Sequence, residues 1–165
     1  MDWQVPLLVS AVIFAAFLVF RMRPAVTSRG RATAAALVDA RRRIEAAKDD
    51  HARALALADA ADACAHLGRT TSAQGYYLRA LRSDPASTRI VERTATGLAK
   101  RPNALEHLMW RHLGSHPWQG EMRDASLACL RVLARIYTKK RRHDVRAQAI
   151  EHALVALGAQ SSDGR

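Results

Sequence analysis

The chain has 165 residues with a formal net charge of +11, and 49% of them are hydrophobic although only 5% are aromatic. Because aromatic residues are so few, Ala and Leu must form most of the core, and Ala is both the best helix former and small enough for close packing. The sequence contains only 2 cysteines, which excludes a small domain stapled by disulfides. The composition therefore predicts an all-α fold of ordinary domain size.

The first element is an uncharged run over residues 5–20, preceded by Trp3 and followed by Arg21 and Arg23. As a helix, this run and its flanking residues cover roughly the 30 Å of a bilayer's hydrocarbon core. A secretory signal peptide would need a positively charged start and a small-residue cleavage site, and neither is present. We therefore predict an uncleaved transmembrane anchor with its flanks over 1–23; a signal peptide and a buried core helix are the alternatives.

The arginines near this run predict its orientation. Those that follow it are Arg21, Arg23, Arg29 and Arg31, whereas Asp2 precedes it. Lys and Arg next to a membrane span are retained on the cytoplasmic side. We therefore predict a single-pass protein of the bacterial inner membrane, with its N-terminus outside and its C-terminal domain in the cytoplasm.

Beyond a juxtamembrane linker over residues 24–30, apolar residues recur at helical spacing throughout residues 31–158, and residues 159–165 form a polar tail. The expected helices cover approximately 31–48, 51–67, 71–82, 90–98, 105–114, 117–137 and 145–157. No segment alternates between apolar and polar residues as a strand does. We therefore expect a transmembrane helix followed by about seven helices arranged as antiparallel hairpins.

Several helix boundaries are indicated by particular residue types. Asp49 or Asp50 is expected to cap the second helix, and Pro117 to begin the sixth, which should be the longest. Ser115 or His116 would then cap that sixth helix. The two cysteines, Cys64 and Cys129, fall within helical patterns and are expected to be reduced and buried.

The clearest internal repeat spans residues 54–87. Its second half begins with Gly68 at a turn, followed by a small, an aromatic, a small and a proline residue. These are Ala73, Tyr77, Ala80 and Pro85, at the spacing of the tetratricopeptide repeat, which this segment resembles. In the first half, Leu57 stands at the motif's tryptophan position and Cys64 at its tyrosine position. Residues 112–117 and 153–154 echo parts of the same pattern, and an irregular helical bundle is the alternative.

The resemblance also implies how the repeat packs. Small side chains at Ala61 and Ala73 would let the two helices cross closely, and Tyr77 and Leu81 would fill the groove towards the next hairpin. Pro85 cannot continue a helix and would restart the chain for the following repeat. The expected packing residues are therefore Ala61, Ala73, Tyr77, Ala80, Leu81 and Pro85.

Members of the tetratricopeptide family bind protein partners on a concave face lined by the first helix of each repeat. The positions that this resemblance assigns to the partner groove are Leu55, Ala58, Asp62, Ala65 and His66. Chaperone-binding members use Lys, Asn and Arg on this face to hold a C-terminal carboxylate. Because Ala58 and Asp62 stand here instead, we do not expect that specialised activity.

The positive charge gathers in two clusters, one beside the apolar run and one over residues 139–146. Near an anionic membrane each such charge adds about 1 kcal/mol of attraction. The residues expected to contact an anionic surface are Arg21, Arg23, Lys139, Lys140, Arg141 and Arg142. The plainer interpretations are a topology signal for the first cluster and a solvated turn for the second.

The sequence shows no pattern that indicates catalysis. His112 and His116 are four residues apart, but Gly114 and Pro117 interrupt the helix that would align them, and no further residue completes a metal-ligand set. Phosphate-binding loops, nucleophile elbows and paired catalytic carboxylates are absent from the sequence. We therefore expect no enzyme activity, no metal, no cofactor and no small-molecule substrate.

Together these patterns predict a membrane-tethered adaptor or assembly factor that binds a protein partner through a helical-repeat groove. Subunits of membrane complexes are among the expected partners. One alternative is an accessory subunit of a larger membrane protein complex. Another is a lipid- or nucleic-acid-binding module that uses the basic cluster 139–146. Nucleic-acid binding is the less favoured of these, because only Tyr137 lies beside the cluster to stack on bases.

Overall fold

The computed structural model describes residues 9–18, 28–139 and 144–159, and within these ranges every element of regular secondary structure is a helix. The elements are a helix over 9–18, α2 (Ser28–Ala46), α3 (Asp50–His66), α4 (Thr70–Ser83), α5 (Thr88–Gly97), α6 (Pro102–Ser115), the 3₁₀ turn η1 (Gly120–Met122), α7 (Arg123–Lys139) and α8 (Asp144–Ala159). The all-α fold predicted from the composition is therefore confirmed.

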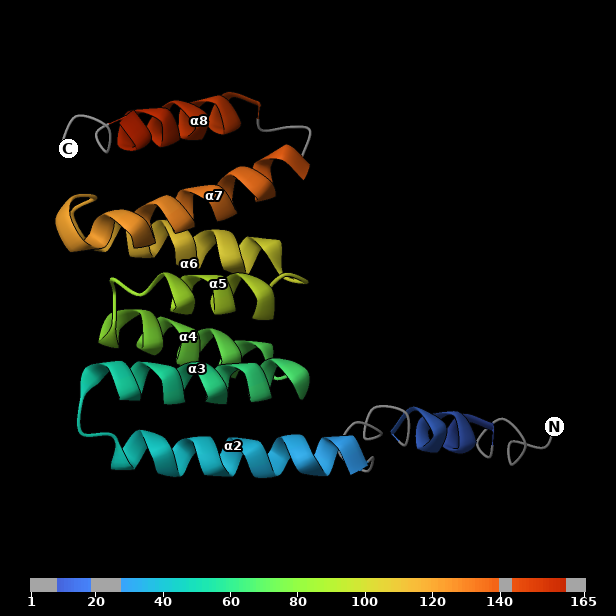
Figure 1. The fold of residues 1–165 in the computed structure, drawn as a ribbon. Coiled ribbons are helices and arrows are strands. Elements are labelled where there is room, and N and C mark those ends of the chain that lie inside the picture. The colour runs from blue at the N-terminus through green and yellow to red at the C-terminus, as the bar shows by residue number, and fades with distance from the viewer. Residues whose placement is uncertain (1–8, 19–27, 140–143, 160–165) are drawn as a thin grey trace.

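Helices α2 to α8 lie one above another in a stack (Figure 1). Alternate helices contact one another, α3 with α5 and α5 with α7, while α4 contacts α6. The stack therefore has two layers, and this repeat-like arrangement places α3, α5 and α7 side by side. At the two ends, α2 packs on α3 and α8 packs on α7.

Two residues at helix boundaries have the roles that are expected of their residue types. The carboxylate of Asp49 accepts a hydrogen bond of 2.6 Å from the backbone N–H of Ala52 and so caps α3. Gly68, between α3 and α4, has a φ of 73°. Glycine adopts this left-handed conformation without the steric penalty that a Cβ atom brings. The expected cap and the expected turn glycine are thus both confirmed.

Alanine makes up much of the core of α3 and α4. Its fully buried members there include Ala54, Ala58, Ala61, Ala73 and Ala80, each 0% exposed. Larger side chains fill the remaining volume, with Tyr77 at 0% and Leu57 and Leu81 at 1% exposure. Burial of each such Leu stabilises the fold by about 1.5–3 kcal/mol relative to exposure. The alanines thus let the helices pack closely, and the larger side chains fill the space that remains between them.

The two cysteines are free thiols within this core, Cys64 in α3 and Cys129 in α7. Burial raises the pKa of both thiols, that of Cys129 to about 12. Because the thiolate is the reactive form, neither side chain is a good nucleophile at neutral pH.

The predicted membrane anchor is not found. Among the residues described, no helix combines the length and the apolar composition that crossing a membrane requires. The helix over 9–18 extends about 15 Å at 1.5 Å per residue, half of the roughly 30 Å hydrocarbon thickness, and residues 1–8 and 19–27 lie outside the described part. The prediction of a single-pass protein, with its N-terminus outside and its domain in the cytoplasm, is therefore wrong.

Two predicted boundaries also differ from the structure. Helix α2 begins at Ser28, so the end of the expected linker 24–30 is helical. Ser115 ends α6 and does not cap a new helix, and α7 begins only at Arg123, after the η1 turn. The indole N–H of Trp118 donates to the carbonyl of Leu113 at 2.8 Å, which folds the chain after Pro117 back onto α6. With 17 residues, α7 is also shorter than α2, which has 19.

His112 is a buried polar residue in α6, 5% exposed, and its Nε2 atom has no hydrogen-bond partner among the described residues. Desolvation by burial lowers its pKa, and the neighbouring His116, whose ring centroid is 5.6 Å away, lowers it further. The folded protein therefore holds His112 neutral at a pH where the unfolded chain already binds a proton.

We expect this difference to make stability depend on pH. An unfolded His titrates at about pH 6.5, so below that value the unfolded state binds more protons than the folded state and the free energy of unfolding falls. Urea unfolding measured between pH 7 and pH 5 should show this decline, and His112→Leu should flatten it. His107→Gln, at an exposed position of α6, is the control and should retain the decline. Equal slopes in all three proteins would contradict the prediction.

Candidate functional site

A cleft of about 540 Å³ lies across α3 and α5. It is lined by Asp62, Ala65, His66, Arg89, Glu92, Arg93, Thr96, Gly97, Ala99 and Lys100. The volume falls within the range of about 300–1,000 Å³ that is typical of ligand sites. Because α3 and α5 are neighbours in the same layer of the stack, the cleft follows directly from the stacking of successive hairpins.

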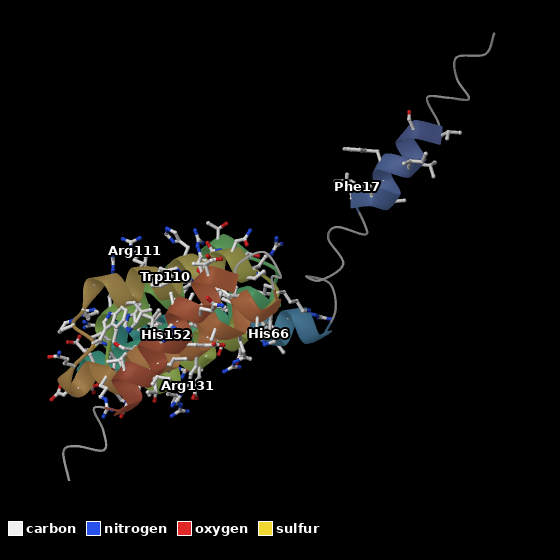
Figure 2. All side chains as sticks on the ribbon, turned by 90° about the horizontal axis from the view of Figure 1, so that it is seen from above. Phe17, His66, Trp110, Arg111, Arg131 and His152 are labelled. Carbon is white, nitrogen blue, oxygen red and sulfur yellow. The ribbon has the colours of Figure 1, made fainter. Side chains whose placement is uncertain are left out.

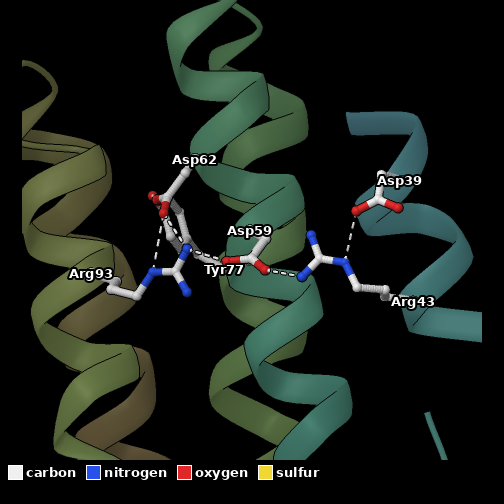
Figure 3. A network of polar contacts seen from close by, with 6 residues as sticks. All are labelled: Asp39, Arg43, Asp59, Asp62, Tyr77 and Arg93. Carbon is white, nitrogen blue, oxygen red and sulfur yellow. Dashed lines mark hydrogen bonds and ion pairs between the residues drawn. The ribbon is translucent and has the colours of Figure 1, made fainter. Parts of the chain in front are cut away.

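The floor of the cleft is held by Arg93, which reaches from α5 to two carboxylates on α3 (Figure 3). Its Nη2 atom donates to Asp59 at 2.6 Å and its Nε atom donates to Asp62 at 3.0 Å. The Tyr77 hydroxyl, from α4, also donates to Asp62. Three helices are thereby joined through a single carboxylate pair.

The same network continues to α2. Arg43 donates to the second oxygen of Asp59 at 2.7 Å and to Asp39 at 3.0 Å (Figure 3). Asp59 therefore accepts from an arginine on each side, from α2 and from α5. Hydrogen bonds to charged groups stabilise proteins by about 1.5–3 kcal/mol each when they are shielded from water. These are partly exposed, so their main structural effect is to fix the spacing of the helices.

The electrostatics of the network leave no uncompensated positive charge on the floor of the cleft. Burial lowers the pKa of Arg93, but the hydrogen bonds that it donates to Asp62 and Asp59 outweigh burial and raise it overall. Burial also raises the pKa of Tyr77, and the hydrogen bond to Asp62 adds to that rise. Tyr77 therefore remains a protonated donor, and the charge of Arg93 is balanced by carboxylates of the protein itself.

The rim of the cleft has a different character. Arg89 and Lys100 are exposed, and neither forms an ion pair with any residue in the described part of the chain. Their positive charges face the cleft together with His66, and the acidic rim residue is Glu92. A surface of this kind attracts a negatively charged group and speeds its encounter.

A smaller apolar pocket of about 250 Å³ continues from this cleft towards α7. It is lined by Ala95, Ala99, Pro102, Leu105, Val132, Arg135 and Ile136. Ala99 lines both depressions, so they adjoin. We call the cleft and the pocket together the groove. It offers charges at one end and aliphatic side chains at the other.

The structure brings three of the five predicted groove residues into the cleft, namely Asp62, Ala65 and His66. Ala58 is 0% exposed, so its expected contact with a partner is wrong: it packs inside the stack because α3 is covered on several sides. Leu55 is half-buried and packs against the core, and it is not among the residues that line the cleft.

The predicted packing residues lie inside the stack, with the exception of a proline at a turn. Ala61, Ala73, Tyr77, Ala80 and Leu81 are all buried. Pro85 is half-buried in the turn between α4 and α5.

The predicted contacts with an anionic surface fall largely beyond the described ranges. Residues 140–142, Arg21 and Arg23 lie outside them, and Lys139 is the last residue of α7. Arg146, the last residue of the basic cluster 139–146, lies 3.6 Å from the carboxylate of Glu106, so at least one arginine of this cluster faces the stack.

Sequence reasoning did not single out the cleft residues of α5, and Arg89, Arg93 and Lys100 were missed. The signal was available in the length of the predicted repeat 54–87, which matches the tetratricopeptide period of about 34 residues. Shifted by one such period, Leu55 becomes Arg89 and His66 becomes Lys100. The predicted groove positions of α3 therefore point to the α5 residues that line the same cleft.

No protein-family model matches the chain, and comparisons with curated proteins and with solved structures likewise gave no match. The described residues also contain no group of three or more His, Cys, Asp or Glu side chains arranged to hold a metal ion. A function must therefore be argued from the groove itself.

Proposed function

We propose that this chain is a protein-binding adaptor of tetratricopeptide-like architecture, and that its groove holds a segment of a partner. The observation that carries this proposal is the register of α3 and α5. The partner-facing positions expected in α3 have counterparts one period of about 34 residues later, and all five counterparts line the cleft. They are Arg89, Glu92, Thr96, Ala99 and Lys100.

The chemistry of the groove describes the segment that would fit. Arg93 is neutralised by Asp59 and Asp62, so the positive charges left for a partner are those of Arg89 and Lys100, which outnumber the single rim carboxylate of Glu92. The adjoining pocket offers aliphatic side chains such as Val132. The best-fitting partner segment therefore carries an acidic residue beside an apolar one, which fills the pocket while the acidic group meets the rim.

A display library of random short peptides tests this proposal even though the partner is not identified. Peptides selected on the full chain should be enriched in acidic residues next to apolar ones. Their affinity should fall at least about tenfold, equivalent to ~1.4 kcal/mol, when Arg89→Glu and Lys100→Glu are combined. Isothermal titration of the selected peptides measures the loss, and circular dichroism confirms that the variant remains helical.

The matched control combines Arg82→Glu with Arg111→Glu, which changes the net charge by the same amount. Both arginines are exposed, and they lie in the other layer, on α4 and α6. This variant should bind the selected peptides as the original chain does. If charge reversal at Arg141 and Arg142 abolished binding while the groove variant retained it, the basic cluster and not the groove would be the binding site.

A further inference from the structure

The helix over residues 9–18 is apolar on every side and is not covered by the rest of the chain. Its large side chains Val9, Val12, Ile13, Phe14, Phe17 and Leu18 are 42–64% exposed. Figure 2 shows this helix, with Phe17 labelled, lying apart from the helical stack. A helix that is hydrophobic all round is normally buried, so this segment requires a binding surface.

The far end of the stack exposes a matching apolar surface. On the outer side of α8, Val145 is 80% and Val155 is 71% exposed. Ala149 and Ala156 are exposed as well, at helical spacing that continues the same stripe, and the exposed polar residues on it are Gln148 and His152. The end helix of a helical-repeat stack usually has a polar outer face. An apolar stripe in this position indicates that another helix packs on α8.

An aromatic pocket of about 470 Å³ lies next to this stripe, between α6, α7 and α8. Its aromatic walls are Trp110, Trp118 and Tyr137, and Ala149 also lines it. The indole N–H of Trp110 donates to the Tyr137 hydroxyl at 2.8 Å, and that hydroxyl donates to Glu106 at 2.7 Å. These bonds hold the rings in place although Trp110 is 41% exposed.

The stripe and the pocket form one continuous region, which we call the α8 surface. Outside the helix over 9–18, the large apolar side chains that are exposed in the described ranges are Val38, Trp110, Val145 and Val155. All except Val38 belong to the α8 surface. Exposed Trp side chains beside a pocket are typical anchors of protein interfaces.

The helix over 9–18 cannot readily reach the α8 surface of its own chain. It precedes α2, and α2 and α8 lie at opposite ends of the stack (Figure 1). The path from α2 through α3, α5 and α7 to α8 has four packing contacts, each with an interaxial distance of roughly 8–10 Å. Residues 19–27 span at most about 35 Å when fully extended, no more than the roughly 32–40 Å that these four steps make between the axes of α2 and α8, and the outer face of α8 lies farther still.

We propose that the helix over 9–18 of one copy packs on the α8 surface of a second copy, with Phe14 or Phe17 in the aromatic pocket. The two contacting surfaces are different, so the contact is heterologous. Heterologous contacts leave one free surface of each kind at the ends and therefore build chains or closed rings. The partner recognised by the α8 surface is thus another copy of this protein.

Sedimentation velocity of the full chain over a range of concentrations tests this assembly. The original protein should form oligomers that grow with concentration. A helix variant, Phe14→Ser with Phe17→Ser, should be monomeric. A surface variant, Ala149→Asp with Val155→Asp, should also be monomeric, and because both substituted positions are exposed, its helicity measured by circular dichroism should be unchanged.

Mixing the two variants gives the most specific result. The mixture retains one functional helix and one functional α8 surface per pair of chains, so it should form dimers and nothing larger. Val38→Asp, at a position 52% exposed on α2, is the control and should assemble like the original chain. An original protein that stays monomeric at all concentrations, or a mixture that forms no dimer, would overturn the proposal.

Discussion

Replacing Tyr77 by Ala should lower the free energy of unfolding by about 3–5 kcal/mol, as other truncations of buried aromatic side chains do. Tyr77 is 0% exposed, so the substitution leaves a cavity where α4 faces α3. It also removes the hydroxyl that donates to Asp62. Urea unfolding of the full chain, followed by circular dichroism, measures the loss.

The neighbouring tyrosine provides a matched control for this substitution. Tyr76 is only half-buried, and its hydroxyl accepts a hydrogen bond from the Arg41 side chain at 3.1 Å. Tyr76→Ala should therefore be clearly less destabilising than Tyr77→Ala. Tyr77→Phe keeps the ring and removes only the hydrogen bond, so it separates packing from polar effects. If Tyr76→Ala were as harmful as Tyr77→Ala, Tyr77 would not be the main packing residue of this hairpin.

Replacing Gly97 by Ala should also destabilise the fold, by about 1–3 kcal/mol or more, as overpacking of a core does. A Cβ atom at this position would overlap the hydroxyl oxygen of Tyr77 and lie 2.7 Å from the Cζ atom of the same ring. The tyrosine cannot move aside easily, because it is buried and bonded to Asp62. Helix propensity alone predicts the opposite sign, since Ala is favoured over Gly by about 1 kcal/mol in a helix.

Gly75→Ala is the control that separates the effect of helix propensity from the effect of a steric clash. Gly75 lies in the interior of α4, and an added Cβ atom would have no neighbour within 4 Å. This substitution should raise the midpoint of thermal unfolding, whereas Gly97→Ala should lower it. The double variant of Gly97→Ala with Tyr77→Phe should be less unstable than the sum of the single changes, because the closest clashing atom is gone. Strict additivity would show that Gly97 and Tyr77 do not interact.

The helices could be predicted from the sequence because their signals are local. Apolar periodicity, the cap at Asp49 and the turn at Gly68 each depend on residues close together in the chain. The buried positions of Ala73 and Tyr77 were implied by the resemblance to a tetratricopeptide repeat, whose motif lies within a single hairpin. These features do not depend on which helices become neighbours.

The groove depends on contacts between distant residues, and sequence reasoning found only part of it. The pairing of Arg93 with Asp59 and Asp62 joins helices that are separated by α4 in the chain. The prediction that Ala58 lies in the groove is wrong because the sequence of α3 alone does not show which of its faces other helices cover. The start of α7 was misjudged for a related reason, because the hydrogen bond from Trp118 to Leu113 favours a folded-back loop over a new helix.

The buried thiols have a practical consequence for experiments on this protein. Cys64 and Cys129 are shielded from solvent and their pKa values are raised, so maleimide reagents react with them slowly in the folded state. A cysteine introduced at Thr96, an exposed residue of the cleft, would then be labelled selectively without removal of the native pair. A fluorophore attached there would report directly on occupancy of the groove in an otherwise unaltered chain.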